Sequence, residues 1–363
     1  MAVTRIGSSP ITRSGDEVKP VEARKVGVGV VGLGFMGRTH VEAFSQVSKC
    51  RLVAVADQEQ ARCRGVVEGG GNLGNEPTGR IFDPESTCVF QNHEELLECE
   101  GIDLVSITTP TPTHVGIAIA AIESGRHVLV EKPVDLTVAG IERIADAAHA
   151  NGVLAMPAHC MRSWPAWSWM RDQVKCQTYG ELKSARFIRA GATPDWNRTF
   201  YLDEAKSGGA AVDLHIHDAD YIVHCLGLPS AVISTGTRKY VRTRYLFDGE
   251  IRVEAEGGWR DDPNAPFTMR AELECSEGTM YFDFGREPEV VVVHENGTTA
   301  PHPEASIGGT GYEVQARRLV DAILAGASES PVTMRDAMST ARLIGCEIAS
   351  LDLGGKTIQL HGS

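Results

Sequence analysis

The sequence has no long hydrophobic run, no excess of positive charge and no paired-cysteine motif. No apolar stretch approaches the roughly 20 residues that a membrane helix needs, and residues 1–24 lack the apolar core of a secretory signal. The formal net charge of −13 argues against nucleic acid or an anionic membrane as a partner, because both attract basic surfaces. The nine cysteines are scattered and odd in number, so we expect reduced thiols in a cytoplasmic protein.

The rest of the composition is that of a globular protein with a sizeable core. The chain has 363 residues, of which 42% are hydrophobic and 23% charged. This length exceeds that of one typical domain. We expect an extension over residues 1–24, flexible or lying on the surface, then a first domain over 25–157 and a second over 158–363.

The first domain alternates β-branched runs with helical periodicity. Residues 26–31 form a continuous apolar run, and residues 51–57 are apolar between Arg51 and Asp57, as expected for strands that are buried on both faces. Further strands are expected over 102–108, 127–131 and 153–156, separated by helices. Repeated strand–helix–strand units predict a parallel, doubly wound sheet. Residues 64–84, rich in Gly, Pro and Asn, are expected to form an inserted loop or flap.

After Pro157 the pattern changes to clustered strands with few crossover helices. Period-two alternation predicts strands over 183–190, 251–259, 267–275, 279–284 and 290–294. Helical periodicity is found over 165–174, 213–226, 312–325 and 334–351. We therefore expect an α+β domain with an open, mainly antiparallel sheet.

A Gly-x-Gly-x-x-Gly motif directly follows the first expected strand and opens a helix. Gly32 permits the tight turn, Gly34 lets a pyrophosphate approach the backbone, and Gly37 lets helix and strand pack. The helix N-terminus, with Phe35 and Met36, offers free N–H groups to phosphates. The context predicts a dinucleotide-binding Rossmann domain, and a structural glycine-rich turn is the alternative.

Asp57 stands at the end of the second expected strand. A carboxylate there can accept hydrogen bonds from both ribose hydroxyls and would repel a 2′-phosphate, so we predict NAD as the cofactor. Arg62 and Arg64 lie nearby in the sequence and keep NADP as the less favoured alternative.

Three further motifs accompany the glycine loop. They are Thr109–Pro110 with His114, Glu131-Lys132-Pro133, and the segment 207–220 that contains Asp213 and His217. Together they resemble the glucose-fructose oxidoreductase, inositol dehydrogenase and rhizopine-catabolism (Gfo/Idh/MocA) oxidoreductase family, over about residues 25–363. The resemblance implies a Rossmann domain followed by an open-faced sheet domain, often paired into homodimers or homotetramers.

The resemblance also implies a reaction and a set of site residues. Hydride passes between nicotinamide and a carbinol of a sugar, cyclitol or related polyol. Lys132 would lie near the nicotinamide and the substrate hydroxyl, with Asp213 and His217 as the other catalytic pair. The remaining implied contacts are His159 and Arg162 to the substrate, and Thr109, Pro110, His114 and Glu131 to the cofactor. Where relatives often read His-Asn-x-Arg-Phe, this chain reads His-Cys-Met-Arg-Ser over residues 159–163.

The segment from Asp213 can also be analysed as a continuous helix. At about 100° per residue, one face would carry Asp213, His217, Asp220 and His224. His215 would point away, so this segment predicts no metal site.

Oxidation of a carbinol requires removal of its O–H proton by a base poised near neutrality. His217 is one candidate, with Asp213 or Asp220 stabilising the imidazolium. Lys132 is the alternative acid or base, or the group that stabilises the oxyanion.

The function predicted is an NAD-dependent oxidoreductase acting on a CH–OH group of a sugar or polyol. One alternative is an NAD-dependent glycosidase of the same fold, which fold alone does not exclude. The other is a non-catalytic NAD-binding regulator, which has no need of Lys132 and His217. We expect no nucleic-acid or membrane partner.

Overall fold

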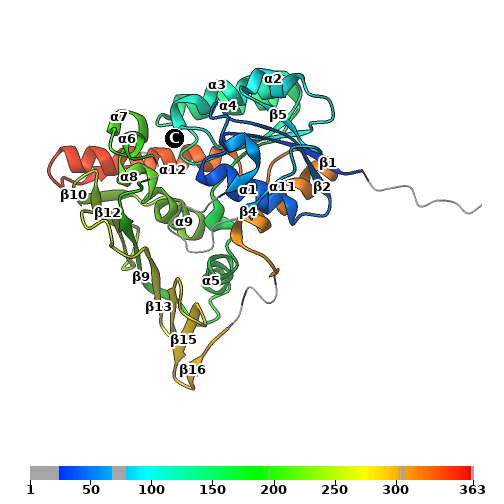
Figure 1. The fold of residues 1–363 in the computed structure, drawn as a ribbon. Helices are drawn as coiled ribbons and strands as arrows, with labels where there is room; N and C mark the ends of the chain where they lie inside the picture. Colours follow the sequence, from blue (N-terminus) through cyan, green and yellow to red (C-terminus); the bar gives the residue numbers. More distant parts are fainter. Residues whose placement is uncertain (1–23, 68–78, 196, 302, 304–306, 361–363) are drawn as a thin grey trace, which may run out of the picture.

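The computed structural model describes residues 24–360 apart from 68–78, 196, 302 and 304–306 (Figure 1). The expected extension over 1–24 lies outside the described residues except for Arg24, and so does the middle of the expected insertion over 64–84. The flanks of this insertion pair as two short strands, β3 (Val66–Val67) and β4 (Gly79–Arg80). No described helix combines the length and apolar character needed to cross a membrane.

Six parallel strands form the sheet of the first domain, in the order β5-β2-β1-β6-β7-β8. They are β1 (Val26–Val31), β2 (Cys50–Ala56), β5 (Cys88–Phe90), β6 (Leu104–Ile107), β7 (His127–Val130) and β8 (Ala155–Pro157). All of β1 and β6 is buried, because helices cover both faces. The predicted parallel, doubly wound sheet is confirmed. The strands that follow β1 first add on one side of it, as β2 and β5, and the chain then crosses to the other side for β6, β7 and β8. The strand order thus reverses between β1 and β6, so a ligand crevice is expected at the carboxyl ends of these two strands.

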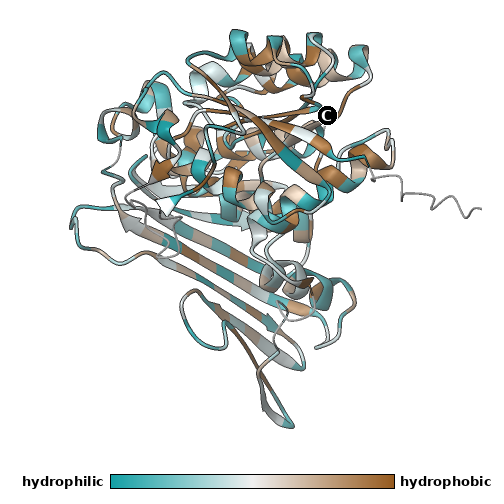
Figure 2. Ribbon diagram, turned by 45° about the vertical axis from the view of Figure 1, so that its right-hand side comes forward, coloured by the Kyte–Doolittle hydropathy of each residue, from teal (hydrophilic) through white to brown (hydrophobic). Residues whose placement is uncertain are grey.

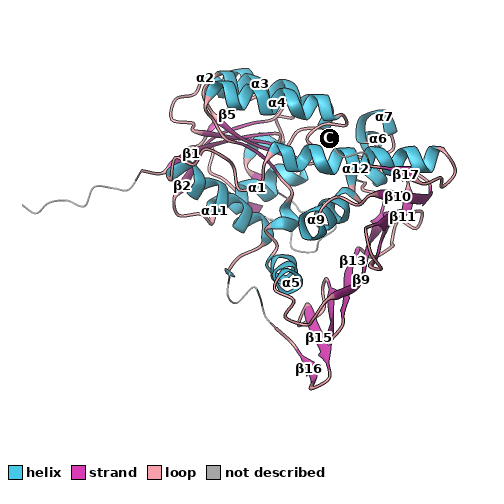
Figure 3. Ribbon diagram, turned by 180° about the vertical axis from the view of Figure 1, so that it is seen from behind, coloured by secondary structure: helices cyan, strands magenta, loops and turns pink. Residues whose placement is uncertain are grey.

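Helices cover this sheet in two groups, which lie above and below it in Figures 1 and 3. One face carries α2 (His93–Glu98), α3 (His114–Glu123), α4 (Val138–Asn151) and the start of α12 (Met334–Asp352). The other carries α1 (Phe35–Ser45) and α11 (Gly311–Leu324), whose Leu319 and Val320 are fully buried. The last strand of this sheet, β8, ends at Pro157, and α11 packs back onto the sheet from much later in the chain.

The second domain is built on a nine-stranded sheet in the order β16-β15-β14-β13-β9-β12-β11-β10-β17. Its strands are β9 (Leu182–Ala192), β10 (Ala231–Gly236), β11 (Tyr240–Leu246), β12 (Arg252–Arg260), β13 (Thr268–Cys275), β14 (Gly278–Asp283), β15 (Val290–His294), β16 (Gly297–Thr299) and β17 (Ile358–Gln359). Among the described strands of this sheet, only β9 and β12 pair in parallel. The predicted mainly antiparallel sheet is confirmed, with β10, β11, β16 and β17 as additional strands.

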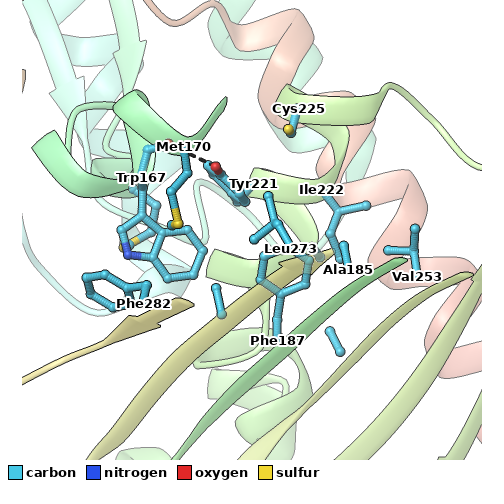
Figure 4. Close-up of a cluster of buried hydrophobic side chains, with 14 of the residues drawn as sticks. Trp167, Met170, Ala185, Phe187, Tyr221, Ile222, Cys225, Val253, Leu273 and Phe282 are labelled. Carbon is cyan, nitrogen blue, oxygen red and sulfur yellow. Dashed lines mark hydrogen bonds between the residues drawn. The ribbon is translucent and has the colours of Figure 1, made fainter. Parts of the chain in front are cut away.

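One face of this sheet is packed against α5 (Pro165–Lys175), α9 (Ile216–Leu226) and α12. Figure 4 shows the contact, in which Trp167 and Tyr221 from the helices meet Phe187 from β9. The three side chains are fully buried, and the Tyr221 hydroxyl donates to the Trp167 carbonyl at 2.8 Å. These edge-to-face aromatic contacts fill the space between the helices and the sheet, so α9 packs closely against the sheet.

The opposite face of the sheet is not covered by other parts of the described chain, and it is charged. Alternation along the strands places polar side chains outward, as the bands of hydropathy in Figure 2 indicate. Arg186 of β9 lies beside Glu254 of β12 and Glu272 of β13, and Arg242 of β11 lies opposite Glu256. Arginine and glutamate therefore alternate across this face.

Three short helices of the second domain lie beside the crevice, and one of them contacts the first domain. They are α6 (Arg198–Tyr201), α7 (Glu204–Ser207) and α8 (Ala210–Asp213). The helix α7 contacts the turn Thr111–Thr113 of the first domain. This segment therefore lies over the carboxyl ends of the parallel strands (Figure 1).

Candidate active site

The glycine loop has the geometry that close approach of a phosphate requires. Gly32 adopts φ +88°, a left-handed conformation that side chains disfavour. A Cβ atom at Gly37 would lie 1.8 Å from the Gly32 carbonyl oxygen, so this position packs loop against helix. A Cβ atom at Gly34 would have no neighbour within 4 Å, because this residue faces open space. The loop therefore fits a dinucleotide pyrophosphate at the start of α1.

Asp57 links this loop to the end of β2. Its Oδ2 accepts a hydrogen bond from the Leu33 N–H at 2.6 Å, and its Oδ1 accepts one from the Glu59 N–H at 2.7 Å. Arg62 lies 3.6 Å from Asp57 and 3.0 Å from Glu59. Because two carboxylates already pair with it, Arg62 does not present a free charge to a 2′-phosphate. The arrangement favours NAD.

A crevice of about 1080 Å³ opens at the carboxyl ends of β1 and β6. The predicted cofactor residues that line it are Gly32, Gly34, Phe35, Met36, Asp57, Thr109, Pro110, His114, Glu131 and Lys132. Gly37 lies beneath the loop, as its packing role requires. The second domain contributes Asn197, Phe200, Tyr201 and Asp213 to the same crevice. The size and shape suit an extended dinucleotide.

His114 braces two loops of the crevice. Its Nε2 lies 2.7 Å from the Thr109 carbonyl oxygen and its Nδ1 lies 3.0 Å from the Pro133 carbonyl oxygen. Burial lowers the pKa of His114 below its ordinary value. Both ring nitrogens thus face backbone, and His114 holds the cofactor-lining loops together.

Glu131 is buried behind the loop that carries Lys132. Its Oε1 lies 3.0 Å from His40 Nε2, and its Oε2 accepts a hydrogen bond from the Lys132 N–H at 2.9 Å. Burial would raise the pKa of Glu131, but the hydrogen bond and charge of His40 and the charge of Lys132 outweigh it and lower that pKa. His40 was not predicted as a site residue. The feature that could have indicated it is a histidine on the face of the first helix that packs on the sheet.

Lys132 meets Asp213 across the two domains. Its Nζ donates to the Asp213 carbonyl oxygen at 2.7 Å and to Asp213 Oδ1 at 3.1 Å. The two side chains are 13% and 15% exposed, so the pair is shielded but reaches the crevice. The structure therefore brings together two of the three predicted catalytic residues.

The helix expected over 213–226 is broken after Asp213. The helix α8 ends there, and α9 begins at Ile216. Between them His215 turns into the core of the second domain, where its Nε2 lies 2.9 Å from Glu347 Oε2 and 3.1 Å from the Tyr245 hydroxyl. His215 points away from the site, as predicted. Because of the break, Asp213 contacts Lys132 and has no hydrogen bond to His217.

His217 lies beside Lys132 with its Nδ1 buried, and no described residue hydrogen-bonds that nitrogen. The pKa of His217 lies well below its ordinary value because of burial, then the charges of Lys132, Arg189 and His159. Burial, with these charges as the smaller cause, therefore keeps the ring neutral near pH 7. Asp213 pairs with Lys132 and Asp220 with Arg162, and the expected stabilisation of an imidazolium by either carboxylate stays a prediction.

His159 and Arg162 take part in a buried network behind the site. Arg162 donates two hydrogen bonds to Asp220, at 2.9 and 2.8 Å, and lies 2.9 Å from Asp336 of α12. His159 Nδ1 lies 3.7 Å from Asp220. Neither residue is among those that line the crevice or the small pocket described next. Their predicted substrate contacts stay predictions, and the geometry gives Arg162 the role of tying α9 to α12.

A second, smaller pocket of about 100 Å³ adjoins the crevice. Lys132, Asp213 and Glu131 line both spaces, and His217 lines the small one. Its aromatic lining residues are Phe35, Trp164, Tyr201, Trp259, Phe267 and Tyr312. Cys160, where relatives often carry asparagine, also lines it. Burial raises the pKa of the Cys160 thiol to about 12, so the thiol stays neutral.

Arg189 also lines the small pocket, and it was not predicted from the sequence, nor were Trp259 and Tyr312. Arg189 could have been identified from the strand alternation, because it shares the inward face of β9 with Ala185 and Phe187. A charged side chain at an inward strand position is costly unless it is paired, so it marks a site or an ion pair.

Two family models match the chain. Residues 26–159 match an oxidoreductase family with an NAD-binding Rossmann fold, and residues 167–298 match the GFO/IDH/MocA C-terminal domain. Among curated relatives, scyllo-inositol 2-dehydrogenase (NAD(+)) from Bacillus subtilis (strain 168) is 27% identical over 288 residues, which cover 76% of this chain and 79% of the relative. Glycosyl hydrolase family 109 protein 1 from Shewanella sp. (strain MR-4) is 35% identical over 177 residues, which cover 48% of this chain and 38% of the relative.

Among solved structures, levoglucosan dehydrogenase in complex with NADH and levoglucosan is similar with a TM-score of 0.77 and 19% identity, covering 93% of this chain and 100% of that one. This likeness concerns the fold. Together the two matched models span most of the chain, and the glycine loop and crevice described above fit them. The chain belongs to the Gfo/Idh/MocA family of NAD-binding oxidoreductases.

Proposed function

We propose that this protein moves a hydride between NAD and a carbinol or carbonyl carbon of a sugar, cyclitol or related polyol. One observation carries the proposal: Lys132 of the first domain meets Asp213 of the second where the crevice adjoins the small pocket. The relatives named as inositol and levoglucosan dehydrogenases support this substrate class. When bound, NAD supplies the hydride acceptor.

Lys132 is proposed to hold the substrate oxygen. An ammonium group has three donors, and the hydrogen bonds to Asp213 use two of them. The third can donate to the carbinol oxygen and stabilise the negative charge that develops on it. Asp213 keeps the ammonium oriented and stays within reach of a second substrate hydroxyl.

His217 is proposed to accept the hydroxyl proton. Its Nδ1 has no hydrogen-bond partner among the described residues, and its lowered pKa keeps the ring in the proton-accepting form. The aromatic walls formed by Trp164, Trp259 and Tyr312 offer apolar surface to the C–H groups of a ring substrate and restrict water around the reacting oxygen.

A glycosidase that oxidises its substrate only transiently is the second candidate, since one relative bears a glycosyl hydrolase name. The two functions differ in net cofactor change. A dehydrogenase forms one NADH for each product, whereas such a hydrolase forms none.

The test is a screen of cyclitols, aldoses and sugar acids with NAD, and of their keto forms with NADH, followed by NADH absorbance. We expect substrate-dependent NADH formation that is lost in the Lys132→Met variant. Release of phenol from aryl glycosides without net NADH would contradict the dehydrogenase and favour the hydrolase. NADH binding without turnover of any compound would contradict both.

We also propose that copies of the chain pair through the uncovered sheet face, giving a homodimer or homotetramer. Its alternating Arg186, Glu254, Glu272 and Arg242 are self-complementary about a twofold axis. A monomer by light scattering at micromolar concentration would reject this.

All nine cysteines are free, which supports a reducing compartment such as the cytoplasm.

A further inference from the structure

The small pocket contains a guanidinium that the proposed chemistry does not use. Arg189 of β9 is 4% exposed, and its Nε and Nη2 donate to Asp218 of α9 at distances of 2.8–3.1 Å. Its guanidinium carbon lies 5.4 Å from the ring centre of Trp167, which fixes its plane. The side chain is therefore held from two sides beside the pocket that it lines.

One nitrogen of this guanidinium is poorly satisfied. Nη1 has the Met269 sulfur as its hydrogen-bond partner, at 2.8 Å. A thioether is a weak acceptor, and Met269 lines the same pocket. A substrate oxygen that enters the pocket offers Nη1 a better acceptor than the sulfur does.

The charges around the pocket are already paired. Arg189 is paired with Asp218 at 2.8 Å, and Lys132 with Asp213 at 3.1 Å. Glu131 lies 3.0 Å from His40. Among the described residues that line the pocket, a carboxylate or phosphate would therefore meet no cation without a carboxylate partner, and it would be brought close to the carboxylates of Asp213 and Glu131. An uncharged oxygen meets no such penalty.

We propose that Arg189, with its charge balanced by Asp218, is a specificity residue that donates through Nη1 to a neutral oxygen of the substrate. The site then takes uncharged sugars or cyclitols and rejects their carboxylate analogues. This inference rests on the proposed function, because it places the polyol in the small pocket.

The first test uses the wild-type protein loaded with NADH, whose nicotinamide carries no positive charge. D-Glucose is compared with D-glucuronate and D-galactose with D-galacturonate, by quenching of tryptophan fluorescence, since Trp164 and Trp259 line the pocket. We expect each neutral sugar to bind at least about tenfold more tightly than its acid, the effect of one poorly compensated charge. Equal or tighter binding of the acids, or no binding of either class, would overturn the proposal. Neutral sugars that bind without turnover would sink the proposed function alone.

The second test changes the charge balance. Asp218→Asn keeps the shape of the side chain but leaves Arg189 with an uncompensated charge, so the preference for the neutral sugar should fall by about tenfold or more. The double variant Asp218→Asn with Arg189→Met removes both charges. It should reject acids as the wild type does and bind neutral sugars more weakly. An unchanged preference in Asp218→Asn, with native circular dichroism and NADH affinity, would overturn the role of the pair.

If Asp218→Asn alone does not fold, the double variant still decides the role of Arg189, because it buries no unpaired charge. Undiminished binding of neutral sugars by that variant would show that Nη1 contacts no substrate oxygen. The paired comparison on the wild type is independent of every variant.

Discussion

Replacing Lys132 with methionine removes an ammonium charge and keeps most of the shape of the side chain. Two consequences follow from the structure. The donor proposed for the substrate oxygen is lost, and so is one of the charges that lower the pKa of His217. The first consequence concerns the rate, and the second concerns the pH dependence.

The size of the rate effect follows from the hydrogen bonds of Nζ. Since Asp213 occupies two of its three donors, one donor remains for the developing oxyanion. Removal of a single such donor lowers kcat by about 10²–10³, or roughly 3–4 kcal/mol of transition-state stabilisation. NAD affinity should change little, because the glycine loop and Asp57 are untouched.

The pH effect has a definite sign. The proton-accepting form of His217 exists above its pKa, which burial and nearby cations hold well below the usual histidine value. In the wild type, kcat/KM should therefore stay level from neutrality to below pH ~6.5 and fall only under more acidic conditions. Without the Lys132 charge, the pKa of His217 rises and this acidic limb moves to higher pH.

Steady-state kinetics across the pH range on a verified substrate measure both effects, and Lys132→Arg serves as the matched control. Arginine keeps the positive charge but not the compact donor, so turnover should fall while the acidic limb stays where it is in the wild type. An acidic limb that does not move in Lys132→Met would refute His217 as the base under the influence of Lys132. A loss of NADH affinity as large as the loss of turnover would refute the assignment of Lys132 to the chemical step.

Two further expectations concern cofactor choice and acid sensitivity. Asp57→Ser removes the carboxylate that repels a 2′-phosphate and releases Arg62 from one of its partners, so fluorescence titrations should show the preference for NADH over NADPH narrowed by about tenfold or more; an unchanged ratio would contradict this. His159 and His217 have lowered pKa values in the folded protein, mainly through burial. Below pH ~6.5 the unfolded chain binds protons first, so each should lower the free energy of unfolding by up to about 1.4 kcal/mol per pH unit. Denaturant unfolding at neutral and mildly acidic pH measures this, and equal midpoints would count against it.

The sequence predicted those parts of the fold that depend on local pattern. Apolar segments rich in valine marked β1 and β2, since strands buried on both faces need no alternation of polar and apolar residues. The glycine loop and Asp57 were predictable because their chemistry is contained in one strand–turn–helix unit. The strand β11 was missed, because Thr243 places a polar residue at an inward position between Val241 and Tyr245.

Features set by long-range contacts were not predictable. Helical periodicity continues across His215, whereas the helix breaks there and His215 pairs with Glu347 of α12, a contact that local pattern does not reveal. The contact of Asp213 with Lys132, 81 residues earlier in the chain, is equally absent from local pattern. The pairing of Arg162 with Asp220 and Asp336 was likewise not predictable, because these residues lie far apart in the sequence and meet only in the folded chain.

The return of α11 to the first domain has a consequence for how the chain folds during synthesis. Leu319 and Val320 cover one face of the parallel sheet, next to Val28 and Val30. A ribosome delivers the strands β9–β16 of the second domain before it delivers these residues, so the part of that face covered by α11 stays bare in the nascent chain although domains generally begin to fold as they emerge. The dinucleotide fold is thus completed by the end of the chain, and a fragment that stops before Gly311 would expose the apolar surface that α11 covers.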